Sequence, residues 1–344
     1  MQSATVLGAL LLLLAACGGA ETEQTAPPPA VASVEESTVA SSTTEPVSST
    51  SPATVSKQSS TKTFDSSPST TPPRAFNGRA IPETVSNSEQ AAELFVEVEQ
   101  ALRVDGQTPD VYADLGHTEQ VLIRSIMRNP DWIEAFRAAL PEDLLVVADL
   151  HITARTELGL LHSGGGSPLE NIPAWEIIEP EAFEVLVEHY QDAEAATGID
   201  WQVLAGINLI ETGMGRIDGL SSAGAQGPMQ FLPTTWPEVS NGGDIDDPAD
   251  AIAGAARYLV QRGGLDDIRD GLWGYNNSDH YVNAVLAYAE LVRLDERALR
   301  GFYNWEIYVG SEVGTLWLPV GFRAPEPTSA SDYLTQNPWA LTLR

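Results

Sequence analysis

Apolar residues recur at helical spacing along most of the chain beyond residue 85. The first run follows a helix-capping sequence at residues 86–88 and places five apolar side chains on one face, Ala91, Leu94, Phe95, Val98 and Leu102. Further helices are expected over residues 118–127 and 132–140. Pro141 begins a longer one, because proline suits the first turn of a helix. The pattern predicts a mainly α-helical accessory region over residues 86–170.

Residues 164–168, with the sequence Gly-Gly-Gly-Ser-Pro, interrupt this pattern and predict a domain boundary. A second domain is expected over residues 173–325. Its helices are expected from Pro180 to Gly198, from Asp200 to Gly213, from Asp247 to Gly263 and from Ser278 onwards. Alternating apolar residues on both sides of a turn at residues 310–314 predict a small C-terminal hairpin. Residues 326–344 are expected to form a loosely held tail.

An apolar run near the start of the chain, Val6–Ala16, is too short to span a bilayer as a helix. It leads into Leu-Ala-Ala-Cys-Gly at residues 14–18, which resembles a bacterial lipobox. Residues 1–16 are therefore interpreted as a lipoprotein signal peptide. Cys17, the only cysteine of the sequence, is interpreted as a lipid-modified residue that anchors the protein to the cell membrane, facing the cell wall. An ordinary secretory signal is the alternative.

Residues 17–85 are dominated by Ser, Thr, Pro and Ala and contain few large apolar side chains. Such a segment cannot bury enough apolar surface to offset its ordering entropy, so we expect a disordered tether. The whole chain has 48 acidic and 18 basic residues, and its two lysines, Lys57 and Lys62, lie in the tether. A protein with a net charge of −30 should not bind nucleic acid or anionic lipid through a basic patch.

Three short motifs follow one another between residues 198 and 281. The first is Glu211, which lies late in an apolar helical run. The second is a loop of mostly small residues, 221–230, which ends in Gly-Pro-Met-Gln. The third is Gly-Tyr-Asn at residues 274–276, with Tyr281 one turn into the next expected helix.

In this order, the motifs resemble those of the lysozyme-like domain of the soluble lytic transglycosylases. The pattern of that family is Glu-Ser, then Gly-Leu-Met-Gln, then Ala-Tyr-Asn. The resemblance covers residues 181–300, and the chain departs from it at Thr212, Pro228 and Gly274, where the family has Ser, Leu and Ala.

The resemblance implies a lysozyme-like fold and a lytic transglycosylase that binds the glycan strands of peptidoglycan and needs no cofactor. Glu211 would protonate the β-1,4 bond between N-acetylmuramic acid and N-acetylglucosamine. Its carboxylate would then take the proton of the muramoyl C6 hydroxyl as that oxygen attacks C1, which leaves a 1,6-anhydromuramoyl end. The implied substrate-binding residues are Ser222, Met229, Gln230, Tyr275, Asn276 and Tyr281. The Tyr275 hydroxyl is expected to orient Glu211 or to stabilise developing charge.

The position of Glu211 also suits a general acid on physical grounds. The negative end of a helix dipole disfavours a carboxylate near the helix C-terminus. The apolar neighbours Ile207, Leu209 and Ile210 predict a low-dielectric surrounding, which raises the pKa of a carboxyl group. Both effects favour the protonated form that a proton donor requires.

Two alternative functions stay open at this point. A hydrolytic muramidase on a similar fold would use a loop aspartate as its base, with Asp218, Asp244, Asp246 and Asp250 as candidates. An inactive peptidoglycan-binding lipoprotein would keep the groove without the activity. No metal site is predicted, because the five histidines lack the spacing of paired ligands and the loop aspartates do not match a calcium loop.

The accessory region carries no chemical motif, since His151 and His162 are isolated and its carboxylates are scattered. We therefore expect it to support the catalytic region without contributing a catalytic group. On this interpretation, a chain beginning near Pro173 would still cut peptidoglycan.

Overall fold

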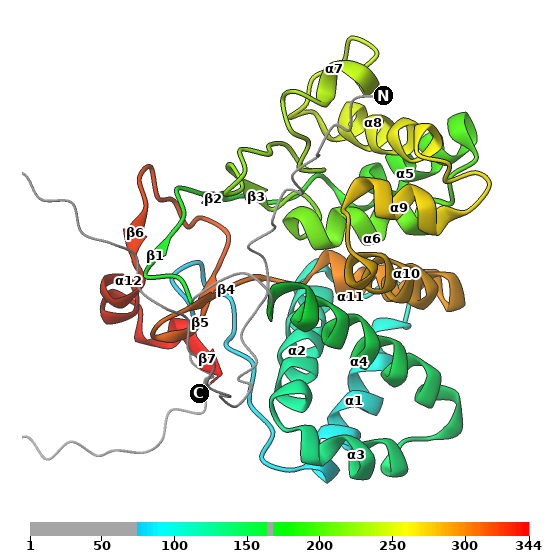
Figure 1. The fold of residues 1–344 in the computed structure, drawn as a ribbon. Helices are drawn as coiled ribbons and strands as arrows, with labels where there is room; N and C mark the ends of the chain where they lie inside the picture. The colour runs from blue at the N-terminus through cyan, green and yellow to red at the C-terminus, as the bar shows by residue number, and fades with distance from the viewer. Residues whose placement is uncertain (1–73, 164–167, 344) are drawn as a thin grey trace, which may run out of the picture. The chain divides into compact units, whose positions relative to one another are not determined.

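The computed structural model describes residues 74–163 and 168–343. Helices dominate these residues (Figure 1), which confirms the predicted mainly α fold. The predicted signal peptide, Cys17 and residues 17–73 of the predicted tether lie outside the described residues. Within the described ranges, no helix combines the length and the apolar character needed to cross a membrane.

Helices form the accessory region at the predicted positions. They are α1 (Ser88–Leu102), α2 (Pro109–Arg128), α3 (Ile133–Ala139) and α4 (Glu142–Ser163), with the short 3-10 helix η1 (Pro130–Trp132) before α3. The side chain of Asn87 accepts a hydrogen bond from the Gln90 backbone N–H, as the capping sequence predicts. Helix α2 begins earlier than residue 118, where it was expected, because Pro109 occupies its first turn.

Further helices form the region that carries the three motifs. They are α5 (Phe183–Thr197), α6 (Trp201–Thr212), α7 (Trp236–Val239), α8 (Pro248–Gln261), α9 (Ile268–Tyr275), α10 (Asp279–Leu294) and α11 (Leu299–Tyr303), with η2 (Glu296–Ala298) before α11. Gly198 and Gly213 end α5 and α6 in the left-handed conformation, with φ of 81° and 61°. Asp247 caps α8 by accepting from the Asp250 N–H. The sequence missed α7 and α9, which are both shorter than a clear periodic pattern.

The predicted hairpin is present as β4 (Ile307–Ser311) and β5 (Gly314–Leu318), and β7 (Leu341–Leu343) pairs with β5 as a third strand. Two further antiparallel pairs are short. Strand β1 (Asn171–Ile172) pairs with β6 (Thr328–Ser329), and β2 (Glu176–Ile177) pairs with β3 (Ile217–Asp218). Strand β3 lines a cavity together with Gly227 and Pro228 of the second motif.

The expectation of a loose C-terminal tail is wrong. Residues after 325 form β6, α12 (Ala330–Gln336), the 3-10 helix η3 (Pro338–Ala340) and β7. The hydroxyl of Tyr333, which is buried, donates to the Trp317 carbonyl oxygen at 2.9 Å. Contacts with the distant hairpin hold this segment, and its own sequence contains no signal for them.

The end of the predicted tether, residues 74–85, is also folded against the rest of the structure. Ala75 is buried, and Arg79 Nη2 forms an ion pair with Glu306 Oε1 at 3.1 Å. The aromatic ring of Phe76 contacts that of Trp339 edge to face. The prediction of disorder is therefore wrong for these residues, because long-range contacts supply the buried surface that their composition lacks.

The accessory region and the region with the motifs share one core. Helix α4 packs along α10 and α2 packs against α11 (Figure 1), and the described residues belong to a single compact unit. The His117 Nε2 atom lies 2.7 Å from the buried Tyr308 hydroxyl of β4. The boundary expected at residues 164–168 therefore does not separate two packing units.

Candidate active site

Helix α6 positions Glu211 within the apolar core. Every residue of this helix except Gln202 is buried, which is the pattern of a helix surrounded by other elements. It packs against α10, α5 and α8. Glu211 is its second-last residue, and only 3% of its surface is exposed. The structure thus places a carboxyl group where water is largely excluded.

The partner of this carboxyl group is Tyr281 on α10. Its hydroxyl donates a hydrogen bond of 2.7 Å to Glu211 Oε1, and its ring is fully buried. The ring of Tyr275 lies parallel to that of Tyr281, with 6.3 Å between centroids. The Tyr275 hydroxyl, however, donates to the Met229 carbonyl oxygen at 2.7 Å. The orienting contact that the sequence assigned to Tyr275 is therefore made by Tyr281.

Burial determines the protonation state of Glu211. Loss of solvation raises its pKa from the ordinary value of 4.5 to about 8, although the hydrogen bond from Tyr281 lowers it. The direction agrees with the apolar surrounding predicted from the sequence. At neutral pH the group is mostly protonated, so it can act as a proton donor.

Two hydrogen bonds connect the second motif, the loop at residues 221–230, to α6. Thr212 Oγ1 and Asn208 Nδ2 both donate to the Pro228 carbonyl oxygen, at 2.6 and 2.8 Å. Gln230 adopts a φ of 47°, a left-handed conformation that is uncommon outside glycine, and paired hydrogen bonds between Gln226 and Phe231 close the turn around it. The loop is thus held by residues of the helix that carries Glu211.

The predicted substrate-binding residues fall into two groups. Met229 is fully buried and Gln230 is nearly so, with the Gln230 amide donating to the Gly227 carbonyl oxygen within the loop. Ser222 is exposed and Asn276 is half-buried at the end of α9. The structure therefore brings Glu211, Tyr281, Tyr275 and the Met229 backbone together. It leaves Ser222 on the surface.

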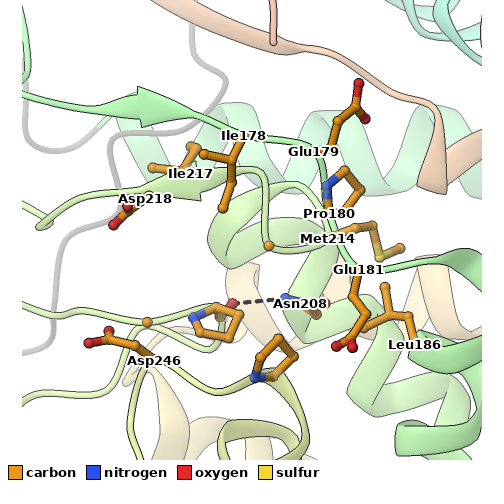
Figure 2. A pocket seen from close by; sticks show the side chains of 14 residues that line it. Ile178, Glu179, Pro180, Glu181, Leu186, Asn208, Met214, Ile217, Asp218 and Asp246 are labelled. Atoms are coloured by element: carbon orange, nitrogen blue, oxygen red, sulfur yellow. Dashed lines mark hydrogen bonds between the residues drawn. The ribbon is translucent and has the colours of Figure 1, made fainter. Parts of the chain in front are cut away.

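A cavity of about 270 Å³ lies next to this loop (Figure 2). Asn208, Met214 and Pro228 contribute to its wall, and four carboxylates line it, Glu179, Glu181, Asp218 and Asp246. Burial, and then the charges of Asp244 and Asp218, raises the pKa of Asp246. Glu211 does not line this cavity, although Asn208 of the same helix does.

Two residues near the site were not assigned a role from the sequence. Asn208 lies inside an otherwise apolar helix, and the buried Tyr190 hydroxyl donates to its Oδ1 at 2.6 Å. An amide within an apolar run was the available signal for a buried polar contact. His280 is half-buried, and its Nδ1 lies 2.7 Å from Glu157 Oε2 of α4. The accessory region thus reaches the residue that precedes Tyr281.

Comparison of the chain with protein-family models, with curated proteins and with solved structures finds no match. The features that bear most directly on function are the buried carboxyl group of Glu211 and the Tyr281 hydroxyl that donates to it.

Proposed function

We propose that the protein is a peptidoglycan lytic transglycosylase in which Glu211 is the single catalytic acid and base. The observation that carries the proposal is the buried Glu211 carboxyl group, with a pKa of about 8 and a hydrogen bond from Tyr281. The three ordered motifs that resemble this enzyme family support it. The substrate would be the β-1,4 bond between N-acetylmuramic acid and N-acetylglucosamine.

The proposed reaction uses the Glu211 carboxyl group twice, first as an acid and then as a base. Protonated Glu211 gives its proton to the glycosidic oxygen, and the bond from that oxygen to C1 of the muramoyl residue breaks. The resulting carboxylate takes the proton of the muramoyl C6 hydroxyl while that oxygen bonds to C1. Glu211 ends protonated, no water is consumed, and the product has a 1,6-anhydro ring.

Tyr281 supports both halves of this cycle in the proposal. A carboxylate has no proton to donate, so the Tyr281 hydroxyl is the donor in this bond after the first proton transfer. The bond then stabilises the negative charge on Glu211. Its buried ring also fixes the direction of the carboxyl group. A donor positioned in advance is worth more in a dry site than in water, because no reorganisation is needed during the reaction.

The hydrolytic alternative requires a second carboxylate on the opposite side of the sugar. Asp218 and Asp246 are the available candidates, because both line the cavity beside the second motif. Glu211 does not line that cavity, so the aspartates do not share this cavity with the proposed proton donor. This arrangement favours a mechanism in which the substrate supplies its own nucleophile.

The proposed location follows from the N-terminal sequence. A lipid on Cys17 would anchor the enzyme to the cell membrane, facing the cell wall, and a Ser/Thr/Pro-rich tether would let it reach glycan strands further out. Release of a Cys17→Ala variant from membranes, or a block in its processing, is the expected result. A variant that still fractionates with membranes would exclude the lipobox interpretation.

Mass spectrometry of purified peptidoglycan after digestion tests the proposed reaction. Anhydromuramoyl ends are expected from the wild-type protein. Reducing ends would identify a hydrolase, and intact glycan with retained binding would identify an inactive binder. The Glu211→Gln variant serves as the inactive reference.

A further inference from the structure

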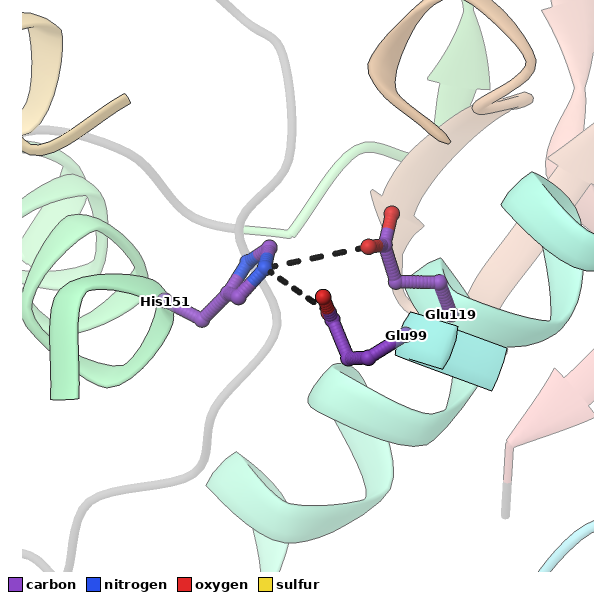
Figure 3. Close-up of side chains that lie close together, drawn as sticks. All are labelled: Glu99, Glu119 and His151. Atoms are coloured by element: carbon purple, nitrogen blue, oxygen red, sulfur yellow. Dashed lines mark ion pairs between the residues drawn. The ribbon is translucent and has the colours of Figure 1, made fainter. Parts of the chain in front are cut away.

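Three titratable side chains from three helices meet inside the accessory region (Figure 3). Glu99 lies on α1, Glu119 on α2 and His151 on α4, and each is at most 2% exposed. One potential ligand atom from each residue lies within 4.8 Å of the other two. Such a convergence of buried ionisable groups needs a compensating interaction.

The two distances from His151 to the carboxylates are longer than those of ordinary hydrogen bonds. His151 Nε2 lies 3.5 Å from Glu99 Oε1 and 3.8 Å from Glu119 Oε1, whereas N–H···O bonds span roughly 2.7–3.2 Å. A tetrahedral zinc ion with bonds of about 2.0–2.2 Å holds its ligand atoms about 3.3–3.6 Å apart. The two distances from His151 are therefore close to those between ligand atoms around one ion.

The orientation of the two carboxylates also favours a bound ion. Trp305 Nε1 donates to Glu119 Oε2 at 2.7 Å, and Arg103 Nη1 donates to Glu99 Oε2. Both outer oxygens are thus held, and the inner ones face His151 (Figure 3). Glu99 Oε1 is fully buried and has no hydrogen-bond partner among the described residues. A buried carboxylate oxygen without a partner costs free energy unless a cation or a proton compensates it.

Either a proton within the cluster, including one on His151, or a bound cation can balance its charge. Burial, and then the neighbouring charge of Glu99, raises the pKa of Glu119 well above its ordinary value. Without a cation, Glu119 would keep a proton and share it with Glu99. A divalent cation would instead neutralise both carboxylates and bind the imidazole nitrogen, which accounts for all three inner atoms at once.

We propose that Glu99, Glu119 and His151 bind a structural divalent transition-metal ion of the zinc class, which ties α1, α2 and α4 together. Two carboxylate oxygens and one imidazole nitrogen supply three ligands of the types that zinc binds. The rings of Phe95, Phe302 and Trp305 surround His151, so the ion is enclosed and enters as the chain folds. The site is separate from Glu211 and is independent of the proposed reaction.

Refolding of the full chain tests the site directly. The denatured protein is refolded either with Zn²⁺ or with EDTA, passed through gel filtration, and its metal content and Tm are measured. We expect about one zinc per chain after refolding with Zn²⁺, and a Tm higher by about 5 °C or more than in EDTA. Refolding with Co²⁺ should give the visible absorption of a protein-bound cobalt ion.

Variants assign the metal to these residues. Glu119→Gln should lose the bound zinc and the cobalt absorption, whereas His189→Ala, which changes an exposed His–Glu pair, should keep both. A folded wild-type protein with no zinc and no cobalt absorption would overturn the proposal and favour the proton-sharing pair. Retention of the metal in folded Glu119→Gln would also overturn it. If that variant fails to fold, the metal content of the refolded wild-type protein decides the question alone.

Discussion

The Tyr281 hydroxyl and Glu211 Oε1 are 2.7 Å apart, and they join two helices that pack together in the core, α10 and α6. The bond acts against burial, because it stabilises the carboxylate form while loss of solvation favours the neutral acid. The pKa of about 8 is the balance of the two effects. Several measurable properties depend on this balance.

Replacement of Glu211 by glutamine should abolish the release of anhydromuropeptides. The amide has nearly the same shape but cannot donate or accept the catalytic proton, so a loss of about 100-fold or more is expected. The circular dichroism spectrum should be unchanged. Glu290→Gln, an exposed change on α10, is the matched control and should keep full activity. Wild-type activity in Glu211→Gln would refute the single-acid mechanism.

The same Glu211→Gln variant should be more stable than the wild-type protein at alkaline pH. The folded-state pKa of Glu211 is raised above its ordinary value of 4.5, so the stability of the wild-type protein falls as pH rises from 4.5 to about 8. The glutamine side chain of the variant does not titrate, and the difference in unfolding free energy should grow over this window to about 1 kcal/mol or more. Urea unfolding of both proteins at several pH values measures it. A difference that stays constant with pH would show that Glu211 is ionised in the folded state.

Activity should fall as pH rises through about 8, because the reaction needs protonated Glu211. In Tyr281→Phe the lowering effect of the hydrogen bond is lost, so this fall should move to higher pH while the maximal rate decreases. Tyr275→Phe is the control, since the Tyr275 hydroxyl bonds to the Met229 carbonyl oxygen and not to Glu211. A pH profile that moves equally in both variants would argue against a specific role of Tyr281.

Thr212 should be replaceable by Ser but not by Val. Val keeps the shape of Thr but removes the hydroxyl that donates to the Pro228 carbonyl oxygen at 2.6 Å. A loss of about 1–3 kcal/mol in unfolding free energy is expected, together with reduced activity from a less ordered loop. Ser supplies the same donor and is the residue found in the family pattern, so it should keep both. Equal stability of the Val and Ser variants would show that the hydrogen bond from residue 212 to the Pro228 carbonyl oxygen does not stabilise the loop.

A chain that begins at Pro173 should fail to fold cooperatively. The sequence favoured retention of activity by such a chain, but α4 covers one side of α10, and α2 contacts α11 and, through His117, β4. Removing these helices exposes apolar surface of α10, the helix that carries Tyr281. Thermal unfolding followed by circular dichroism should show no sharp transition. A soluble, cooperative and active fragment would restore the interpretation of the region as a separate domain.

Features that depend on neighbouring residues could be predicted from the sequence. Asn87 of the predicted capping sequence caps α1, Asp247 caps the helix predicted to begin there, and Gly198 and Gly213 end theirs, because caps and left-handed turns are set within one helical turn. Glu211 could likewise be chosen as the candidate catalytic residue, since an acidic residue late in an apolar helix is visible in the sequence.

The contacts between distant side chains follow from how the helices pack and could not be predicted from the sequence. Tyr275 and Tyr281 look alike in the sequence, and the packing of α10 on α6 determines that Tyr281 contacts Glu211. The same holds for the cluster of Glu99, Glu119 and His151, whose members lie on three helices without any local spacing signal. Burial raises the pKa of Glu211 and of Glu119, and burial depends on every element packed around a residue, which the local sequence does not specify.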